Sequence, residues 1–250
     1  MRSNLRLPDT IEACLLDLDG VLTRTAELHA DAWKRTFDAF LRPRAEPDGT
    51  RPRPFDAVAD YDAYVDGKPR EDGVRSFLAS RGIELPEGTP ADPPSAETVQ
   101  GLGLRKNELV LRLMAERGVA AYEGSLRFLA EARGAGLGLA VVTSSENADA
   151  ILRAAGLEGH FDVQVDGKVA DELGLAGKPA PDGFLEAARR LGVEPRSAAV
   201  FEDALAGVAA GRTGGFGFVV GVDRGGQAAE LRARGADVVV SDLADLLAAP

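Results

Sequence analysis

The chain has 250 residues and a formal net charge of −11, with Lys and Arg scattered among acids. This charge pattern argues against nucleic acid or an anionic membrane as the main partner. No stretch approaches the roughly 18 apolar residues of a membrane span, and the N-terminus lacks the apolar core of a signal peptide. The single cysteine, Cys14, lies in an apolar run, so we expect a buried, inert thiol and no disulfide. We expect a cytoplasmic monomer that binds a small molecule.

The first predicted element is a strand over Glu12–Leu18, which runs into Asp17, Asp19 and Gly20. Apolar residues at helical spacing and Pro-rich interruptions then alternate, without the apolar and polar alternation of a strand. In chain order we expect a helix over 25–41, a loop rich in Pro and Arg over 42–54, a helix over 70–83, a Pro-rich loop over 85–94 and a helix over 96–117.

From Gly136 onward, short apolar runs alternate with helical segments. We expect strands over 137–144, 161–165, 197–203, 216–222 and 236–240, and helices over 147–157, 181–193 and 204–215. Such alternation predicts a parallel sheet covered on both faces. The fold class is therefore α/β: a Rossmann-like parallel-sheet core, residues 1–24 and 119–250, with a helical cap domain, residues 25–118, inserted after the first strand. We expect the cap to act as a lid.

Polar side chains stand where three of the predicted strands end. In open parallel sheets, ligands bind beyond the carboxyl ends of the strands, so these side chains should meet at one rim. Acids crowded in one pocket repel each other unless a cation lies among them, and oxygen-only ligands favour Mg²⁺ over zinc. The sequence therefore predicts a magnesium site. Its expected residues are the four acids, Asp17 and Asp19 after the first strand and Glu202 and Asp203 after "AAVF"; Thr143 and Ser144 end the second strand at the same rim.

Lys178, in "GKPAPDGF", comes after the third strand and before a helix that a proline initiates. Its point charge suits a phosphate or an ionised aspartate. Taken singly, an acidic pair after a strand is often a helix cap or a turn, and a Lys-Pro pair is often part of a solvated loop. The occurrence of all these features in order favours a functional site.

The segments "DLDGVL", "VVTSS", "GKPAPDGF" and "VFEDALAG" resemble the motifs of the haloacid dehalogenase superfamily. Most members transfer phosphoryl groups through an aspartyl-phosphate. The resemblance implies that Asp17 is the nucleophile and that Asp19 is the general acid and base, with a backbone carbonyl that can reach the metal. It further implies that Thr143 holds the transferred phosphoryl group, that Lys178 is its charge partner, and that Asp203 binds Mg²⁺ with Glu202 beside it.

Within the predicted cap, "TAELHADAW", "DGKPRED" and "LRKNEL" resemble the β-phosphoglucomutase branch, which interconverts β-glucose 1-phosphate and glucose 6-phosphate. The resemblance implies that His29 and Lys106 couple cap closure to proton transfer, and that Arg70 holds the phosphate that is not transferred. From the residues alone, the simpler interpretation is that Arg70 lies at the solvated start of a helix and that His29 is an ordinary histidine on a helix surface. The remaining residues of the implied sugar-phosphate pocket are Trp33, Gly67, Lys68, Ser144, Ser145 and Asn147.

Two departures bear on the substrate. Glu146 stands where the mutase pattern often has a basic residue near the remote phosphate, and the segment before "GKPRED" is long and rich in Pro and Arg. Our first hypothesis is a Mg²⁺-dependent mutase that works through β-glucose 1,6-bisphosphate. The alternative is a phosphatase of the same superfamily that acts on a sugar or polyol phosphate. A third possibility, an inactive metabolite sensor, has no need for both a nucleophile and an adjacent acid.

Overall fold

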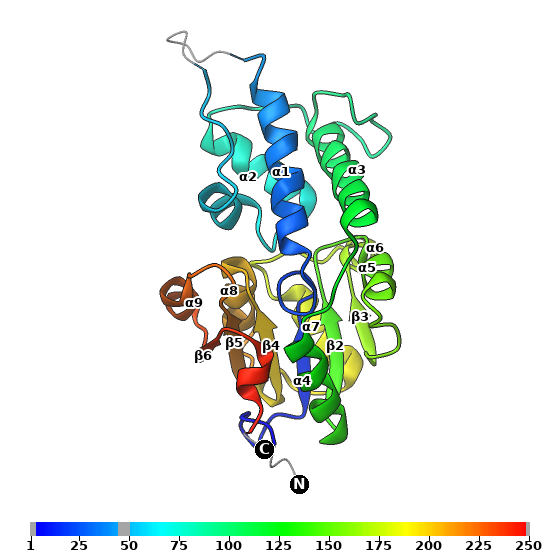
Figure 1. Cartoon of the computed structure of the whole chain (residues 1–250), viewed down its shortest axis with the longest axis vertical. Helices are drawn as coiled ribbons and strands as arrows, with labels where there is room; N and C mark the ends of the chain where they lie inside the picture. The colour runs from blue at the N-terminus through cyan, green and yellow to red at the C-terminus, as the bar shows by residue number, and fades with distance from the viewer. Residues whose placement is uncertain (1–3, 45–50, 249–250) are drawn as a thin grey trace. The chain divides into compact units, whose positions relative to one another are not determined.

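The computed structural model describes residues 4–44 and 51–248 (Figure 1). The chain divides into two compact units, which we call the core, Met1–Arg24 with Val119–Pro250, and the insertion, Thr25–Gly118. Within the described ranges, every helix is too short or too polar to cross a bilayer.

The core contains a six-stranded, fully parallel sheet with strand order β3-β2-β1-β4-β5-β6. Its strands are continuous apolar runs because helices cover both faces of the sheet. The α/β prediction is confirmed, and the strands are a little shorter than predicted. They are β1 Ala13–Leu16, β2 Gly138–Val142, β3 Val163–Val165, β4 Ala198–Glu202, β5 Phe218–Val222 and β6 Val238–Val240.

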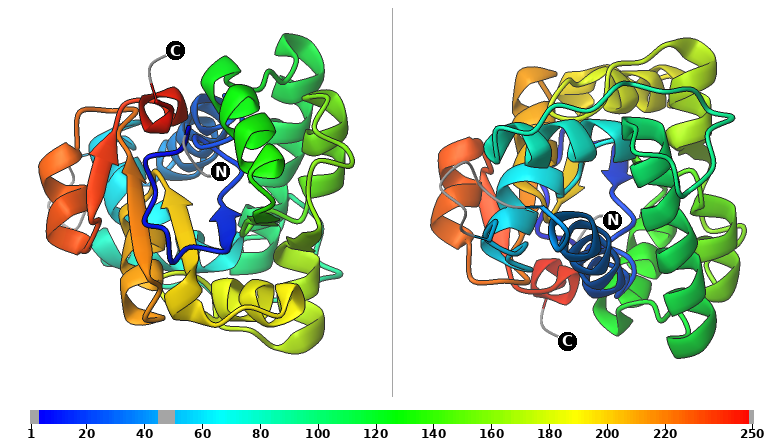
Figure 2. Two further views of the ribbon diagram at one scale, coloured as in Figure 1. Left: turned by 90° about the horizontal axis from the view of Figure 1, so that it is seen from below. Right: turned by 90° about the horizontal axis from the view of Figure 1, so that it is seen from above.

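Alternate residues of each strand supply the two faces of the sheet. On one face, Ala13 and Leu15 of β1 pack in a cluster with residues of α7, α8 and α9. On the other face, Phe201 of β4 packs against Phe128 of α4, with ring centroids 5.1 Å apart. Figure 2 shows α4 and α7 on opposite sides of the sheet. The core helices are α4 Glu123–Gly134, α5 Ala148–Ala154, α6 Gly167–Leu173, α7 Asp182–Leu191, α8 Leu205–Thr213 and α9 Ala228–Arg234, with 3₁₀ helices η2 Pro195–Ser197 and η3 Leu243–Leu246.

The insertion is helical, as predicted, and has an aromatic core of its own. The ring of Phe37 lies 5.0 Å from that of Trp33 and 4.0 Å from that of Phe77, centroid to centroid. The apolar spacing of the first predicted helix therefore reflects burial inside the insertion. Its helices are α1 Ala26–Leu41, the π-helix η1 Tyr61–Val65, α2 Arg70–Ser80 and α3 Val99–Arg117.

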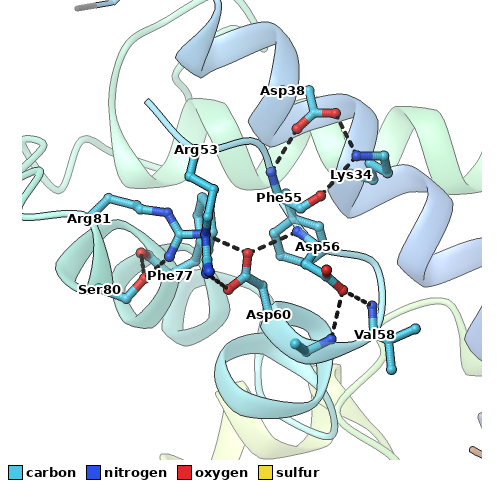
Figure 3. Close-up of polar contacts among 11 residues, drawn as sticks. Lys34, Asp38, Arg53, Phe55, Asp56, Val58, Asp60, Phe77, Ser80 and Arg81 are labelled. Carbon is cyan, nitrogen blue, oxygen red and sulfur yellow. Dashed lines mark hydrogen bonds and ion pairs between the residues drawn. The ribbon is translucent and has the colours of Figure 1, made fainter. Parts of the chain in front are cut away.

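The two Pro-rich stretches are loops wherever the structure describes them, and residues 45–50 of the first lie outside the described ranges. The end of this first loop is bound to α2 by a buried carboxylate, Asp60 (Figure 3). Asp60 accepts hydrogen bonds from Nη2 of Arg53 at 2.9 Å, from Nη2 of Arg81 at 2.5 Å and from the Asp56 backbone at 2.9 Å. The Arg81 guanidinium also lies over the Phe77 ring, 4.6 Å from its centroid. Charged contacts thus attach the loop to the aromatic core.

Candidate active site

The chain turns sharply where β1 ends. The backbone N–H of Asp17 still donates to the Phe201 carbonyl of β4 at 3.0 Å. Gly20 then has a φ of +82°, and a Cβ atom at this position would lie 1.7 Å from Oδ2 of Asp203. Only glycine satisfies both the positive φ and the close approach of the carboxylate. The glycine therefore brings the acids of the first and fourth strands together.

Lys178 lies among these acids and is itself buried. Its Nζ donates to Oδ1 of Asp17 at 2.5 Å and forms an ion pair with Oε1 of Glu202. Burial lowers the pKa of Lys178, but the two carboxylates outweigh burial and raise the pKa above its usual value. The lysine is therefore held as an ammonium ion. We expected Lys178 to follow the third strand directly, but the helix α6 lies between β3 and the loop that carries Lys178.

Carboxylate oxygens of Asp17, Glu202 and Asp203 lie within 4.8 Å of one another, and all three residues are buried. Burial raises the pKa of Asp17 well above its usual value; Lys178 acts in the opposite direction, and Glu202 adds to the rise. One ammonium ion thus faces several carboxylates, and a divalent cation would favour their ionised forms. The all-oxygen donor set fits a hard cation of this kind.

The members of this carboxylate group differ in what holds them. Oε2 of Glu202 accepts a hydrogen bond from the Ala204 backbone at 3.2 Å, in addition to the ion pair of Oε1 with Lys178. A Cβ atom on Gly207 would lie 2.0 Å from the Glu202 carboxylate, so the helix α8 presses closely on it. Glu202 is therefore placed to orient Lys178, while Asp17 and Asp203 are the better candidates for direct metal ligands. The carboxylate of Asp19, which is on the turn, is not part of the group.

The polar residues after β2 form the loop that leads into α5. The Ser145 backbone donates to Oγ1 of Thr143 at 3.1 Å, and the Asn147 backbone donates to Oγ of Ser145 at 3.2 Å. The carbonyl of Ser145 in turn accepts from Gly167, the first residue of α6, at 3.1 Å. Thr143 is buried at the end of its strand, and Ser144 and Glu146 complete the loop. The local turn chemistry thus fixes the hydroxyl of Thr143 at the carboxyl end of the sheet.

In the insertion, the structure brings His29, Trp33 and Lys106 together. The Nζ of Lys106, a buried residue, lies 2.9 Å from Nδ1 of His29 and 4.9 Å from the centroid of the Trp33 ring. Of the two ring nitrogens of His29, Nδ1 is the one that faces Lys106. Trp33 is also stacked on Phe37 and only 3% exposed, which makes it a core residue of the insertion.

The other insertion residues implied by the resemblance lie at the beginning of α2. Gly67 has a φ of +70°, and Nζ of Lys68 donates to Oγ of Ser76 at 3.0 Å. Burial lowers the pKa of Lys68. Arg70 donates from Nε to Oε1 of the adjacent Glu71 at 2.9 Å, so its guanidinium already has an acidic neighbour.

Sequence reasoning missed Arg224, which lies in the loop after β5 and donates from Nε to the carbonyl of Gly20 at 2.8 Å. The signal was present, since the polar residues Asp223 and Arg224 directly follow the strand "FGFVVGV". The same rule that selected the other strand ends applies to this one.

Comparison with known proteins agrees with this architecture. The model of the haloacid dehalogenase-like hydrolases matches residues 11–215. A protein named β-phosphoglucomutase from Mycobacterium bovis is 58% identical over 246 residues, which cover 97% of this chain and 94% of the relative. A β-phosphoglucomutase from Bacillus subtilis is 33% identical over 240 residues, covering 94% and 92% of the two chains.

Among solved structures, a hydrolase from Pseudomonas syringae superimposes with a TM-score of 0.74 at 25% identity, covering 94% of this chain and 95% of that one. The fold, the order of the motifs and these relatives all indicate the same family. The chain belongs to the haloacid dehalogenase-like hydrolases, in the branch that includes the β-phosphoglucomutases.

Proposed function

We propose that this protein is a Mg²⁺-dependent β-phosphoglucomutase, which interconverts β-D-glucose 1-phosphate and glucose 6-phosphate through an aspartyl-phosphate. The observation that carries the proposal is the buried group of Asp17, Lys178, Glu202 and Asp203. The relative from Mycobacterium bovis supports the choice of reaction. We further propose that the enzyme works as a monomer in the cytoplasm, on a sugar phosphate and not on a nucleic acid or a membrane.

Asp17 is the nucleophile in this proposal. Its Oδ forms a bond to phosphorus of β-glucose 1,6-bisphosphate while the bond between phosphorus and the sugar oxygen breaks. Asp19 donates a proton to that oxygen and later removes a proton from the hydroxyl that attacks the aspartyl-phosphate. This second attack releases Asp17 and regenerates a bisphosphate, so the cycle is closed.

In both half-reactions an oxygen nucleophile must approach an anionic phosphoryl group, and positive charge has to offset the repulsion between them. The Nζ of Lys178, held by Asp17 and Glu202, supplies fixed charge beside the nucleophile. When bound by Asp17, Asp203 and the Asp19 carbonyl, Mg²⁺ would supply further charge to the phosphoryl oxygens. The Thr143 hydroxyl is the proposed donor to the transferred phosphoryl group.

A mutase also has to retain the sugar while it presents either of two phosphates. We assign the phosphate that is not transferred to Arg70, because a guanidinium can bind a phosphate bidentately. A guanidinium has five N–H donors, so the bond to Glu71 does not exclude a phosphate. His29 and Lys106 are the proposed link between insertion closure and proton transfer by Asp19. The proposed sugar contacts come from Gly67, Lys68, Ser144, Ser145 and Asn147. Trp33, which the resemblance adds to this set, is a core residue of the insertion and is not proposed as a contact.

The competing hypothesis is a sugar-phosphate or polyol-phosphate phosphatase. It is favoured by Glu146, an acid where the mutase pattern often has a base, and by the acidic neighbour of Arg70. The two hypotheses differ in whether a sugar hydroxyl or water attacks the aspartyl-phosphate.

The decisive experiment supplies the protein with β-glucose 1-phosphate, a trace of β-glucose 1,6-bisphosphate and Mg²⁺, and follows glucose 6-phosphate and free phosphate in the same sample. The proposal expects glucose 6-phosphate to form well ahead of phosphate, and no turnover for Asp17→Asn. Asp19→Asn should still phosphorylate Asp17 slowly but transfer the group poorly. Faster release of phosphate than formation of glucose 6-phosphate would establish the phosphatase instead.

A further inference from the structure

Arg224 joins three segments of the core that are distant in sequence. Its Nε donates to the Gly20 carbonyl at 2.8 Å, and its Nη1 donates to the Ser241 carbonyl at 2.7 Å and to Oδ2 of Asp242 at 3.1 Å. The flat guanidinium also lies 3.6 Å from the centroid of the Tyr122 ring. These contacts need donors that diverge in one plane and an apolar face above them, which arginine provides and lysine does not.

The Gly20 carbonyl belongs to the residue that directly follows the proposed acid and base, Asp19. Its turn is closed by bonds from the Gly20 backbone to the Thr23 carbonyl at 2.8 Å and from the Thr23 backbone to the Leu18 carbonyl at 2.9 Å. Asp17, by contrast, is still bonded to β4 through its backbone N–H. The sheet therefore fixes Asp17, and the bond to Arg224 connects the turn that carries Asp19 to the rest of the core.

The other end of this connection is well anchored. Asp242 caps η3 by accepting from the Ala244 backbone at 2.9 Å. It also lies so close to Gly124, in the first turn of α4, that a Cβ atom there would be 1.5 Å from its Oδ1. Tyr122, just before α4, donates its backbone N–H to the Leu22 carbonyl at 3.0 Å. The turn, Arg224 and Tyr122 thus form a closed ring of contacts.

We propose that Arg224 is a positioning residue that directs Asp19 toward the oxygen it protonates and deprotonates. The proposal rests on the proposed function, because it requires Asp19 to transfer protons. It predicts that loss of the guanidinium harms the steps that need Asp19 more than the formation of the acyl phosphate on Asp17 from a donor that needs no proton. A residue that only stabilises the fold would affect both steps in proportion.

The test separates the two steps with Arg224→Gln. Acetyl phosphate phosphorylates Asp17 and releases acetate, which is a good leaving group and needs no proton from Asp19. Transfer from the aspartyl-phosphate to β-glucose 1-phosphate does need Asp19. In single-turnover measurements with Mg²⁺, we expect Arg224→Gln to slow transfer at least about tenfold and phosphorylation less than about threefold, within the usual effect of a positioned acid or base.

Arg133→Gln is the matched control, because Arg133 also makes fork-like contacts in the core, to Asp162 at 2.7 Å and to the His160 carbonyl at 2.8 Å, away from the Gly20 turn. The ratio of the two rates should stay at the parent value in this control. Equal slowing of both steps by Arg224→Gln, or the same change of ratio in Arg133→Gln, would overturn the proposal. If Arg224→Gln does not fold, Arg224→Lys keeps the charge and permits the same ratio to be measured.

The outcome is separable from that of the proposed function. If the parent enzyme forms no glucose 6-phosphate, the mutase assignment fails, but water still attacks the aspartyl-phosphate with Asp19 as base. The ratio of hydrolysis to phosphorylation then tests Arg224 on the same terms.

Discussion

Replacing Gly20 by alanine tests whether the close approach of Gly20 and Asp203 shapes the metal site. The added Cβ atom would lie 1.7 Å from Oδ2 and 2.5 Å from Cγ of Asp203, far inside contact distance. One of the two has to move, and the turn is held on both sides by hydrogen bonds to Thr23 and Arg224. We therefore expect the Asp203 carboxylate to shift.

The expected cost has two parts. A residue other than glycine at a φ of +82° lowers the free energy of unfolding of the protein by about 1–2 kcal/mol. Displacing a group that binds or orients a metal typically weakens affinity about 10- to 100-fold. Gly156→Ala is the matched control, since Gly156 has a φ of +70° and nothing within 4 Å of the added methyl group. It should lose a similar amount of stability without any change in the metal site.

The assay is a Mg²⁺ titration of initial rate for the parent and both variants, together with urea denaturation in EDTA. Both variants should unfold at lower urea, but only Gly20→Ala should need at least about tenfold more Mg²⁺ for half-maximal rate. Parent-like Mg²⁺ dependence in Gly20→Ala would refute the reasoning, and so would an equal shift in Gly156→Ala.

The other predictions concern the ion pair, the insertion, the metal and the remote phosphate. Gly207→Ala should push the Glu202 carboxylate, 2.0 Å from the added carbon, out of its ion pair; we expect kcat to fall between about tenfold and 100-fold, measured at saturating substrate and Mg²⁺. Asp60→Asn removes the charge that pairs with Arg81 inside the insertion, and should lower the unfolding free energy by about 3 kcal/mol in urea denaturation. The enzyme should have no activity in EDTA and regain it when Mg²⁺ is added, as measured by the formation of glucose 6-phosphate; full activity after exhaustive chelation would contradict the mechanism. Arg70→Ala should slow isomerisation at least about tenfold, from about 1.5–3 kcal/mol of lost phosphate binding, yet leave hydrolysis of acetyl phosphate unchanged.

The sequence predicted the fold well because its signals are local and strong. The strands are uninterrupted apolar runs, and a strand such as β4 is buried along its whole length. The helix α1 carries its apolar residues on one face, and the structure buries Trp33 and Phe37 from that face. By contrast, the helices η1, α4, α6 and α9 were not predicted. Three of them, η1, α6 and α9, have 5 to 7 residues, too few for a period to be recognised, whereas α4 was overlooked although Phe128, Leu129 and Ala132 recur at helical spacing.

The candidate site likewise has residues that the sequence predicted and contacts that it did not. The strand-end rule was enough to bring Asp17 and Asp203 together, because a parallel sheet brings its carboxyl ends to one rim, whereas Lys178 follows the helix α6 and not a strand. The ion pair between Lys178 and Glu202 was not predictable, since it depends on the path of the loop between α6 and α7, which no local sequence pattern encodes. The strand-end rule could also have selected Arg224, but its bond to the Gly20 carbonyl could not have been predicted, because a backbone partner leaves no signature in the sequence.

The segments that lead into and out of the insertion lie next to each other in the core. Thr23 and Ala121 form an antiparallel bridge, and the Arg24 backbone donates to the Ala120 carbonyl at 2.9 Å. The cost of closing a loop rises only slowly with its length, so two segments joined in this way can accept insertions of very different size between them. Evolution can therefore exchange or lengthen the segment between Thr25 and Gly118 without rebuilding the sheet that carries the acids. A long stretch rich in Pro and Arg, such as this chain has, then lengthens the insertion while the acids at the ends of β1 and β4 keep their places.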